Sequence, residues 1–207
     1  MPSSLTQPRT FTPGTTGWTA ADLDDPDIER QWFNGRYEIV EGVLATMPPA
    51  YFLAGQALQK LIYRVTRHIG EEAGSFAAEV DIIIDDCRIA RADAVFMTLA
   101  EETRQNEAAL AAGHTDPART RILIPPTLII ESLSPGHEQH DQRTKRRWYA
   151  EFGVANYWLL DPFKRTLQCL VLRDGSYHDD AYGQANDEVR PSLFPGLILR
   201  LGELWNA

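Results

Sequence analysis

The sequence is poor in cysteine and contains no long apolar run. Cys87 and Cys169 are the only cysteines among 207 residues, and neither stands in a metal-binding spacing. We interpret both as buried free thiols of a cytoplasmic protein. No apolar stretch approaches the roughly 20 residues that a transmembrane helix needs. The N-terminus also lacks the charged and then apolar layout of a secretory signal. We therefore expect no membrane partner and no disulfide framework.

Positive charge is scarce as well. The formal net charge is −9, whereas proteins that depend mainly on nucleic-acid affinity are usually basic. A chain of this composition can hold a polyanion only through a local cationic surface or through metal ions. The densest basic run is "RTKRR" at residues 143–147, and taken alone it is typical of a solvated helix face.

Several familiar catalytic motifs are missing. The chain has no Gly-rich phosphate loop, no Ser/His/Asp order and no reactive-cysteine context. His137 and His140 are three residues apart, one short of the His-Glu-x-x-His spacing of zinc proteases. We therefore expect two solvated loop histidines there and no zinc site.

Apolar periodicity predicts a single α+β domain over residues 19–207, preceded by a flexible arm at residues 1–18. The arm is rich in Pro, Thr, Gly and Ser and shows no apolar period. The domain has alternating strand patterns and one apolar stripe with helical spacing. The main expected elements are a hairpin around Glu41-Gly42, a helix over Leu53–Ile69, strands over Phe76–Ile84 and Ile89–Met97, a strand at "TLIIES" and a helix over Asp141–Phe152.

One carboxylate stands where an apolar residue is expected. Glu131 lies in "LIIESL", a run that predicts a strand buried on both faces. A buried carboxylate costs several kcal/mol unless it is paired, hydrogen-bonded or bound to a metal. Glu131 is therefore a candidate functional residue.

Three further charged residues fall on neighbouring predicted elements. Glu38 lies in the first hairpin, Asp93 lies in the middle of "RIARADAVFM", and Lys145 is one turn into the helix after Glu131. Two carboxylates can hold a hard cation such as Mg²⁺, and a lysine beside them can offset charge in phosphodiester hydrolysis. The ordinary alternatives are that Asp93 caps a turn, Glu38 faces solvent and Lys145 pairs with Asp141 four residues earlier.

The order and spacing of several motifs resemble a known family. "YEIVEGVLATMPPA", "RADAVF", "IIESLSPG", "DQRTKRRWYAEFGVANYWLLDP" and "LFPGLIL" resemble the Uma-two family of predicted restriction endonucleases, a branch of the PD-(D/E)xK nuclease superfamily. The resemblance covers about Thr19 to Trp205. It implies a restriction-endonuclease-like α+β fold, in which a central mixed β-sheet is flanked by helices and carries an N-terminal β-hairpin.

The resemblance also assigns roles to residues. It implies that Asp93, Glu131 and the backbone carbonyl of Ser132 bind Mg²⁺, with Mn²⁺ as a substitute. Lys145 would be the family's catalytic lysine, moved from the strand to the next helix, and Glu38, its first-hairpin glutamate, would be catalytic as well, together with Asp93 and Glu131. The chain departs from the family at Arg91-Ala92, where Gln-Pro is usual.

We expect a metal-dependent endonuclease that acts on nucleic acid, with DNA as the first choice and a homodimer as the assembly. The basic residues beside the predicted site are candidate nucleic-acid contacts: Arg143, Arg146 and Arg147. The first alternative is a catalytically inactive nuclease-fold module with a binding or regulatory role, which the acidic composition favours. A second alternative is a metal phosphohydrolase for small substrates.

Overall fold

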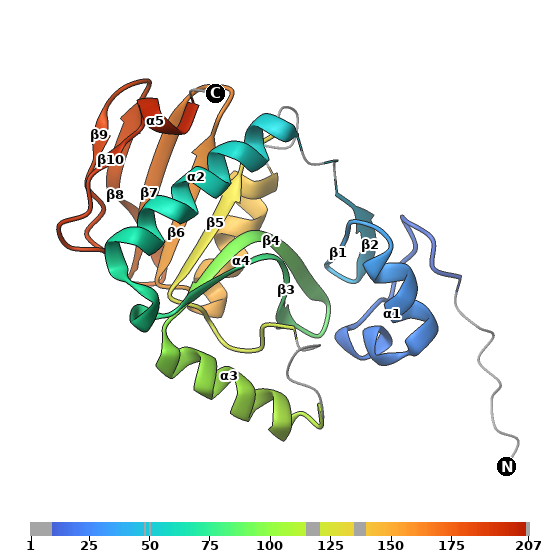
Figure 1. The fold of residues 1–207 in the computed structure, drawn as a ribbon. Helices are drawn as coiled ribbons and strands as arrows, with labels where there is room; N and C mark the ends of the chain where they lie inside the picture. The colour runs from blue at the N-terminus through green and yellow to red at the C-terminus, as the bar shows by residue number, and fades with distance from the viewer. Residues whose placement is uncertain (1–9, 48, 50, 115–120, 135–139, 206–207) are drawn as a thin grey trace, which may run out of the picture.

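The computed structural model describes residues 10–47, 49, 51–114, 121–134 and 140–205, with only the backbone of residues 140–142. Its centre is a mixed sheet in which β4 lies beside three other strands (Figure 1). The sheet strands are β1 (Tyr37–Val40), β2 (Val43–Thr46), β3 (Ser75–Asp85), β4 (Arg88–Met97), β5 (Leu128–Ser132), β6 (Asn156–Asp161), β7 (Thr166–Arg173) and β8 (Ser176–Gln184).

The strand order is β2-β1-β4-β5-β6-β7-β8, and β3 pairs with the other edge of β4. Only β5 and β6 are parallel, and the remaining pairs in this sheet are antiparallel. The predicted α+β fold with a central mixed sheet and an N-terminal hairpin is therefore confirmed. The hairpin turns at Glu41-Gly42, where both residues have positive φ (50° and 78°), as its tight two-residue turn requires.

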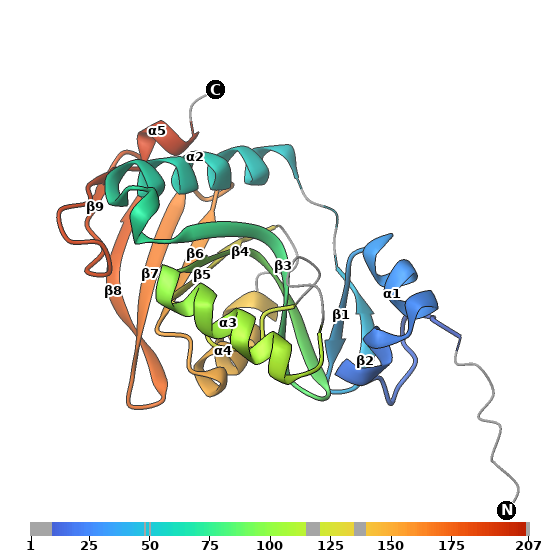
Figure 2. The ribbon, with the colours of Figure 1, turned by 60° about the horizontal axis from the view of Figure 1, so that its bottom comes forward.

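Helices cover both faces of the sheet. Helix α2 (Phe52–Ile69) lies along one face and α4 (Arg146–Phe152) along the other (Figures 1 and 2). Successive residues of a strand point to opposite faces. Ile130 therefore packs in the α2-side core with Leu61, whereas Ile129 packs in the α4-side core with Trp148. Both layers exclude water from the strand that carries Glu131.

The remaining elements complete the described part of the chain. They are the 3₁₀ turns η1 (Ala20–Asp24) and η2 (Glu71–Ala73), the helices α1 (Pro26–Phe33), α3 (Leu99–Ala111) and α5 (Gly202–Trp205), the π-helix η4 (His140–Lys145) and the small strands β9 (Glu188–Val189) and β10 (Leu199–Arg200). Within the described residues, no helix is both long and apolar enough to cross a membrane.

Two details differ from the sequence-based expectation. The first is the expected arm at residues 1–18, of which residues 1–9 lie outside the described part of the chain. Beyond it the chain packs on the hairpin, where Gly14 donates a backbone hydrogen bond to Leu44 and Trp18 is buried. The apolar Trp18 side chain anchors this stretch. The expected helix over Asp141–Phe152 is a π-helix that passes into α4 at Arg146.

The two cysteines are both free thiols. Cys169 is buried and Cys87 is only partly buried, so the prediction of two buried thiols holds for Cys169 alone. Burial raises the pKa of the Cys169 thiol well above its usual value, and the negative charge of Asp180 adds to the effect. Cys169 is therefore a packing residue of the core rather than a nucleophile.

Candidate active site

The candidate site forms where two strands separate along one edge of β4. Along that edge, β1 pairs with β4 at Ile89 and β5 pairs with it from Ala94 to Phe96. On this edge, no strand of the described part of the chain pairs with the stretch between them, whereas β3 pairs with the other edge. The backbone of Arg91 in this stretch is instead satisfied by side chains, because its N–H donates to Glu38 Oε1 (3.0 Å) and its C=O accepts from Lys145 Nζ (2.9 Å).

Lys145 joins two of the predicted carboxylates. Its Nζ lies 2.8 Å from Glu38 Oε1 and 3.1 Å from Glu131 Oε1. The three residues are nearly inaccessible, with exposed fractions of 1% for Lys145, 2% for Glu131 and 3% for Glu38. An ammonium group has three donors, and here three acceptors surround it: the two carboxylates and the Arg91 carbonyl. The ion pairs offset the cost of burying Glu131.

Asp93 and Glu131 lie on the adjacent strands β4 and β5, as expected. The Asp93 carboxylate reaches across to β5 and accepts a hydrogen bond from the backbone N–H of Ser132 (2.7 Å). The side chain therefore holds the end of the strand that presents Glu131. Ser132, whose carbonyl is the third expected metal ligand, also lines the cavity with Asp93 and Glu131.

An irregularity in the β3–β4 ladder coincides with Asp93. Ala92 packs in the α4-side core, while Ala94 packs in the α2-side core, although residues two apart in a regular strand share a face. On β3, Glu79 has φ of 54° between the pairs Ala78–Ala94 and Val80–Ala92. A left-handed conformation costs a residue with a side chain about 1–2 kcal/mol, and such strain is common near functional sites.

Three residues at the site were not predicted from the sequence. Tyr149 is fully buried, and its hydroxyl donates to Glu131 Oε1 (2.7 Å). Arg36 binds both carboxylate oxygens of Glu79 at 2.8 Å and lies 3.9 Å from Asp93 Oδ1. In the sequence, Tyr149 stands next to Trp148, and nothing in this pair of residues indicates a contact with Glu131. Glu79 and Arg36 gave no signal, because 43 residues separate them.

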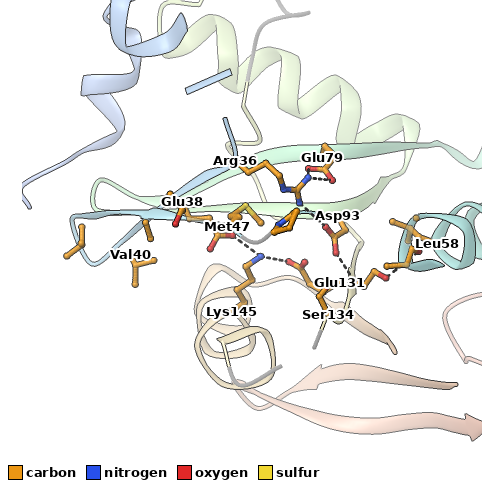
Figure 3. Close-up of a pocket in the computed structure, with 17 residues that line it drawn as sticks. Arg36, Glu38, Val40, Met47, Leu58, Glu79, Asp93, Glu131, Ser134 and Lys145 are labelled. Carbon is orange, nitrogen blue, oxygen red and sulfur yellow. Dashed lines mark hydrogen bonds and ion pairs between the residues drawn. The ribbon is translucent and has the colours of Figure 1, made fainter. Parts of the chain in front are cut away.

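The four predicted residues share one cavity of about 550 Å³ with Arg36 and Glu79 (Figure 3). The cavity wall thus has four carboxylates and two cations, a formal excess of two negative charges. Most of the remaining wall is apolar and comes from β1, β2, the segment after β2 and the start of α2. These apolar residues are Val40, Val43, Ala45, Met47, Pro49, Ala54 and Leu58.

The predicted basic contacts lie outside this cavity. Arg143 is exposed. Arg146 donates to the backbone oxygen of Tyr177 on β8 (2.7 Å), and Arg147 pairs with Glu41 at 3.2 Å while 60% of its side chain is exposed. The structure therefore does not gather the three arginines into a cationic strip at the cavity wall. Their role in binding nucleic acid stays a prediction.

Other sequence-based suggestions fall on residues that cannot be placed. His137 lies outside the described residues, as do the side chains of His140 and Asp141. The alternative in which Asp141 pairs with Lys145 therefore concerns a side chain outside the described residues.

The donor atoms available for a metal are oxygens. Asp93, Glu131 and the Ser132 carbonyl are hard ligands of the kind that Mg²⁺ prefers. No three His, Cys, Asp or Glu side chains converge as a ligand set in the described part of the chain. A site with only two carboxylates is compatible with Mg²⁺, because this ion is usually bound by one or two carboxylates and keeps several waters.

Comparison with known proteins gives a consistent family and fold. No curated protein matches this chain. A solved structure that does match is that of "a putative nuclease belonging to DUF820 from Anabaena variabilis ATCC 29413". It is 16% identical, has a TM-score of 0.63 and aligns over 83% of this chain and 90% of its own, a likeness that shows the fold. The sequence profile of the Uma2 family, described as "Putative restriction endonuclease", matches residues 29–202. The chain therefore belongs to the Uma2 family.

Proposed function

We propose that this protein is a metal-dependent endonuclease that hydrolyses phosphodiester bonds in nucleic acid, with DNA as the first substrate to test. The observation that carries the proposal is that Glu38, Asp93, Glu131 and Lys145 line one cavity. Its formal excess of negative charge favours a divalent cation over a bare phosphate. Membership of a family described as restriction endonucleases supports the same chemistry.

Asp93, Glu131 and the Ser132 carbonyl would hold Mg²⁺, with Mn²⁺ as its substitute. When bound, such an ion supplies Lewis-acid polarisation of a phosphoryl oxygen. The cation would also reduce the electrostatic repulsion between the acidic cavity and a phosphate group. Both Lys145 and Tyr149 contact the same oxygen of Glu131, Oε1, and these two contacts fix the orientation of the carboxylate before any ion arrives.

Lys145 would act on the reacting phosphate as a fixed positive charge. Because Glu38 and the Arg91 carbonyl hold its Nζ, the ammonium can stabilise charge that develops on a phosphoryl oxygen with little reorganisation. Glu38 is then a positioning residue for Lys145. The pairing of two copies to cut both strands of a duplex stays a prediction from the family resemblance.

One observation favours the alternative of an inactive nuclease-fold module. Glu38 and Lys145 complete the hydrogen bonding of the Arg91 backbone, and a buried backbone group needs such a partner in any folded protein. Their burial is therefore explained without catalysis. In that case the protein would use its nuclease fold for binding or regulation, and the cavity would have no hydrolytic activity.

Plasmid nicking in Mg²⁺ or Mn²⁺ distinguishes the two functions. We expect wild-type protein to nick DNA. Asp93→Asn, purified in the same way, should lose at least about 10–100-fold, the range known for residues that only support a metal ligand. Glu188→Gln makes the same chemical change at an exposed position of β9 and should nick like the wild type. Equal nicking by Asp93→Asn would identify a contaminant, and no activity on DNA or RNA would favour the inactive module.

A further inference from the structure

Two carboxylates of the cavity stand at opposite positions of neighbouring strands. The β3–β4 ladder is paired in the same register on either side of Glu79 and Asp93, so these residues lie across from each other. Both line the cavity, and their side chains are 45% and 18% exposed. Like charges directly opposite on adjacent strands are destabilising. A cation beside both groups is therefore needed to offset their repulsion.

Arg36 supplies this cation, and it contacts the two anions unequally. Its Nη1 lies 2.8 Å from each carboxylate oxygen of Glu79 and donates a hydrogen bond to both. Its Nη2 lies 3.9 Å from Asp93 Oδ1, which is an ion pair but too long for a hydrogen bond. Figure 3 shows the guanidinium of Arg36 beside both carboxylates. Arg36 is therefore bound to Glu79 and attracted to Asp93.

The main chain around Arg36 is held in place, whereas its side chain is partly open to solvent. The Met47 N–H donates to the Arg36 carbonyl (2.8 Å), and the Arg91 guanidinium donates to the carbonyl of Gly35 (3.0 Å). The Arg36 side chain is 29% exposed and has several rotatable bonds. The guanidinium can therefore move between its two partners while the start of β1 stays where it is.

A guanidinium at this place repels any cation that Asp93 binds. A positive charge within about 4–6 Å of a carboxylate lowers the affinity of that carboxylate for a proton by about 10–1,000-fold. The same repulsion acts on a divalent ion. Glu79 opposes it, because its two hydrogen bonds keep the guanidinium from closing on Asp93 and its negative charge offsets that of Arg36.

From these contacts we infer that Arg36 competes with the metal ion for Asp93, and that Glu79 limits this competition by holding Arg36. The two residues then set the affinity of the site for its cation without being ligands of it. This inference rests on the proposed function, because it takes Asp93 as a ligand of the ion.

Titration with MnCl₂ alone, followed by electron paramagnetic resonance of the free ion, tests the role of Arg36. Arg36→Gln should bind Mn²⁺ at least about fivefold more tightly than the wild type, the lower end of the usual coupling between two binding events. Arg36→Lys keeps the charge and should stay closer to the wild type. Arg190→Gln is the control, since Arg190 also pairs with a glutamate (2.7 Å) and is 61% exposed, and it should bind like the wild type. Unchanged or weaker binding by Arg36→Gln would overturn the inference.

A double-mutant cycle tests the role of Glu79. Glu79→Gln should weaken Mn²⁺ binding, because it releases the guanidinium toward Asp93 and removes a nearby negative charge. In the Arg36→Gln background the same substitution should weaken binding less, since only the second effect remains. Equal weakening in both backgrounds would overturn the holding role of Glu79. Melting curves recorded without metal establish that each variant is folded.

Failure of the proposed function gives a different pattern. The tighter Mn²⁺ binding of Arg36→Gln should disappear when Asp93→Asn is added. If it does, and yet neither the wild type nor Arg36→Gln cleaves DNA or RNA, the inference holds and the endonuclease proposal fails. Nicking by the wild type without tighter binding in Arg36→Gln would uphold the catalytic proposal and reject the inference. Absence of Mn²⁺ binding in every protein would reject both.

Discussion

The ammonium group of Lys145 lies 2.8 Å from the Glu38 carboxylate, and neither side chain is more than 4% exposed. Glu131 is the second anion, at 3.1 Å. These contacts join the first hairpin, the strand β5 and the segment that leads into α4. Lys145 is therefore part of the structure of the site as well as a candidate for its chemistry, and the two roles require separate measurements.

Lys145→Ala should lower the free energy of unfolding by about 3–5 kcal/mol, because it leaves buried carboxylates without their cation. Urea denaturation measures this loss. Lys164→Ala is the control, since Lys164 is 61% exposed in its pair with Asp161 and such pairs contribute about 0–1 kcal/mol. A loss below about 1 kcal/mol in Lys145→Ala would contradict the structural role. Activity of this variant is informative only at temperatures where it remains folded.

Tyr149→Phe tests the charge on Glu131. The lost hydroxyl donates to a carboxylate, and hydrogen bonds to charged groups contribute about 1.5–3 kcal/mol. Tyr177→Phe is a matched control, because the Tyr177 hydroxyl is buried and donates at the same 2.7 Å to the neutral carbonyl of Val154. Its loss should cost only about 0.5–1.5 kcal/mol. Equal losses in guanidinium unfolding would indicate that Glu131 is not ionised in the folded protein.

Metal binding should raise the melting temperature. An ion that binds only the folded state adds about 2.7 kcal/mol of stability at 100 times its Kd. Differential scanning fluorimetry with a Mg²⁺ or Mn²⁺ titration measures the shift. We expect no shift in Asp93→Asn and a retained shift in Glu188→Gln. The same shift in Asp93→Asn would place the ion away from the proposed ligands.

The sequence predicts the framework of the site better than its contacts. Strand alternation places Asp93 and Glu131 within strands, because burial determines which residues form the core, and the family resemblance implies that these two strands lie side by side. The π-helix before Arg146 and the left-handed backbone of Glu79 leave no periodic pattern. The Tyr149–Glu131 and Arg36–Glu79 contacts depend on how separate elements pack, which local spacing does not contain.

Arg91, which stands where the family usually has Gln, illustrates this limit. Its guanidinium binds both carboxylate oxygens of Asp81 at 2.7 and 3.2 Å. The indole N–H of Trp32 donates to the same carboxylate (2.6 Å). All three residues are at most 7% exposed. The network connects α1 with β3 and β4, and therefore holds the N-terminal part of the chain against the sheet.

A double-mutant cycle on Arg91 and Asp81 should reveal strong coupling. Arg91→Ala leaves a buried carboxylate with only Trp32 as a partner and should cost about 3–5 kcal/mol, as should Asp81→Ala. The double variant should be less destabilised than the sum of the two, by about 0.5–3 kcal/mol, because it buries no unpaired charge. Urea denaturation provides the four free energies. Strictly additive losses would show that the pair makes no net contribution.

Because the Arg91 backbone also contacts Glu38 and Lys145, we further expect Arg91→Ala to weaken metal binding without touching a proposed ligand.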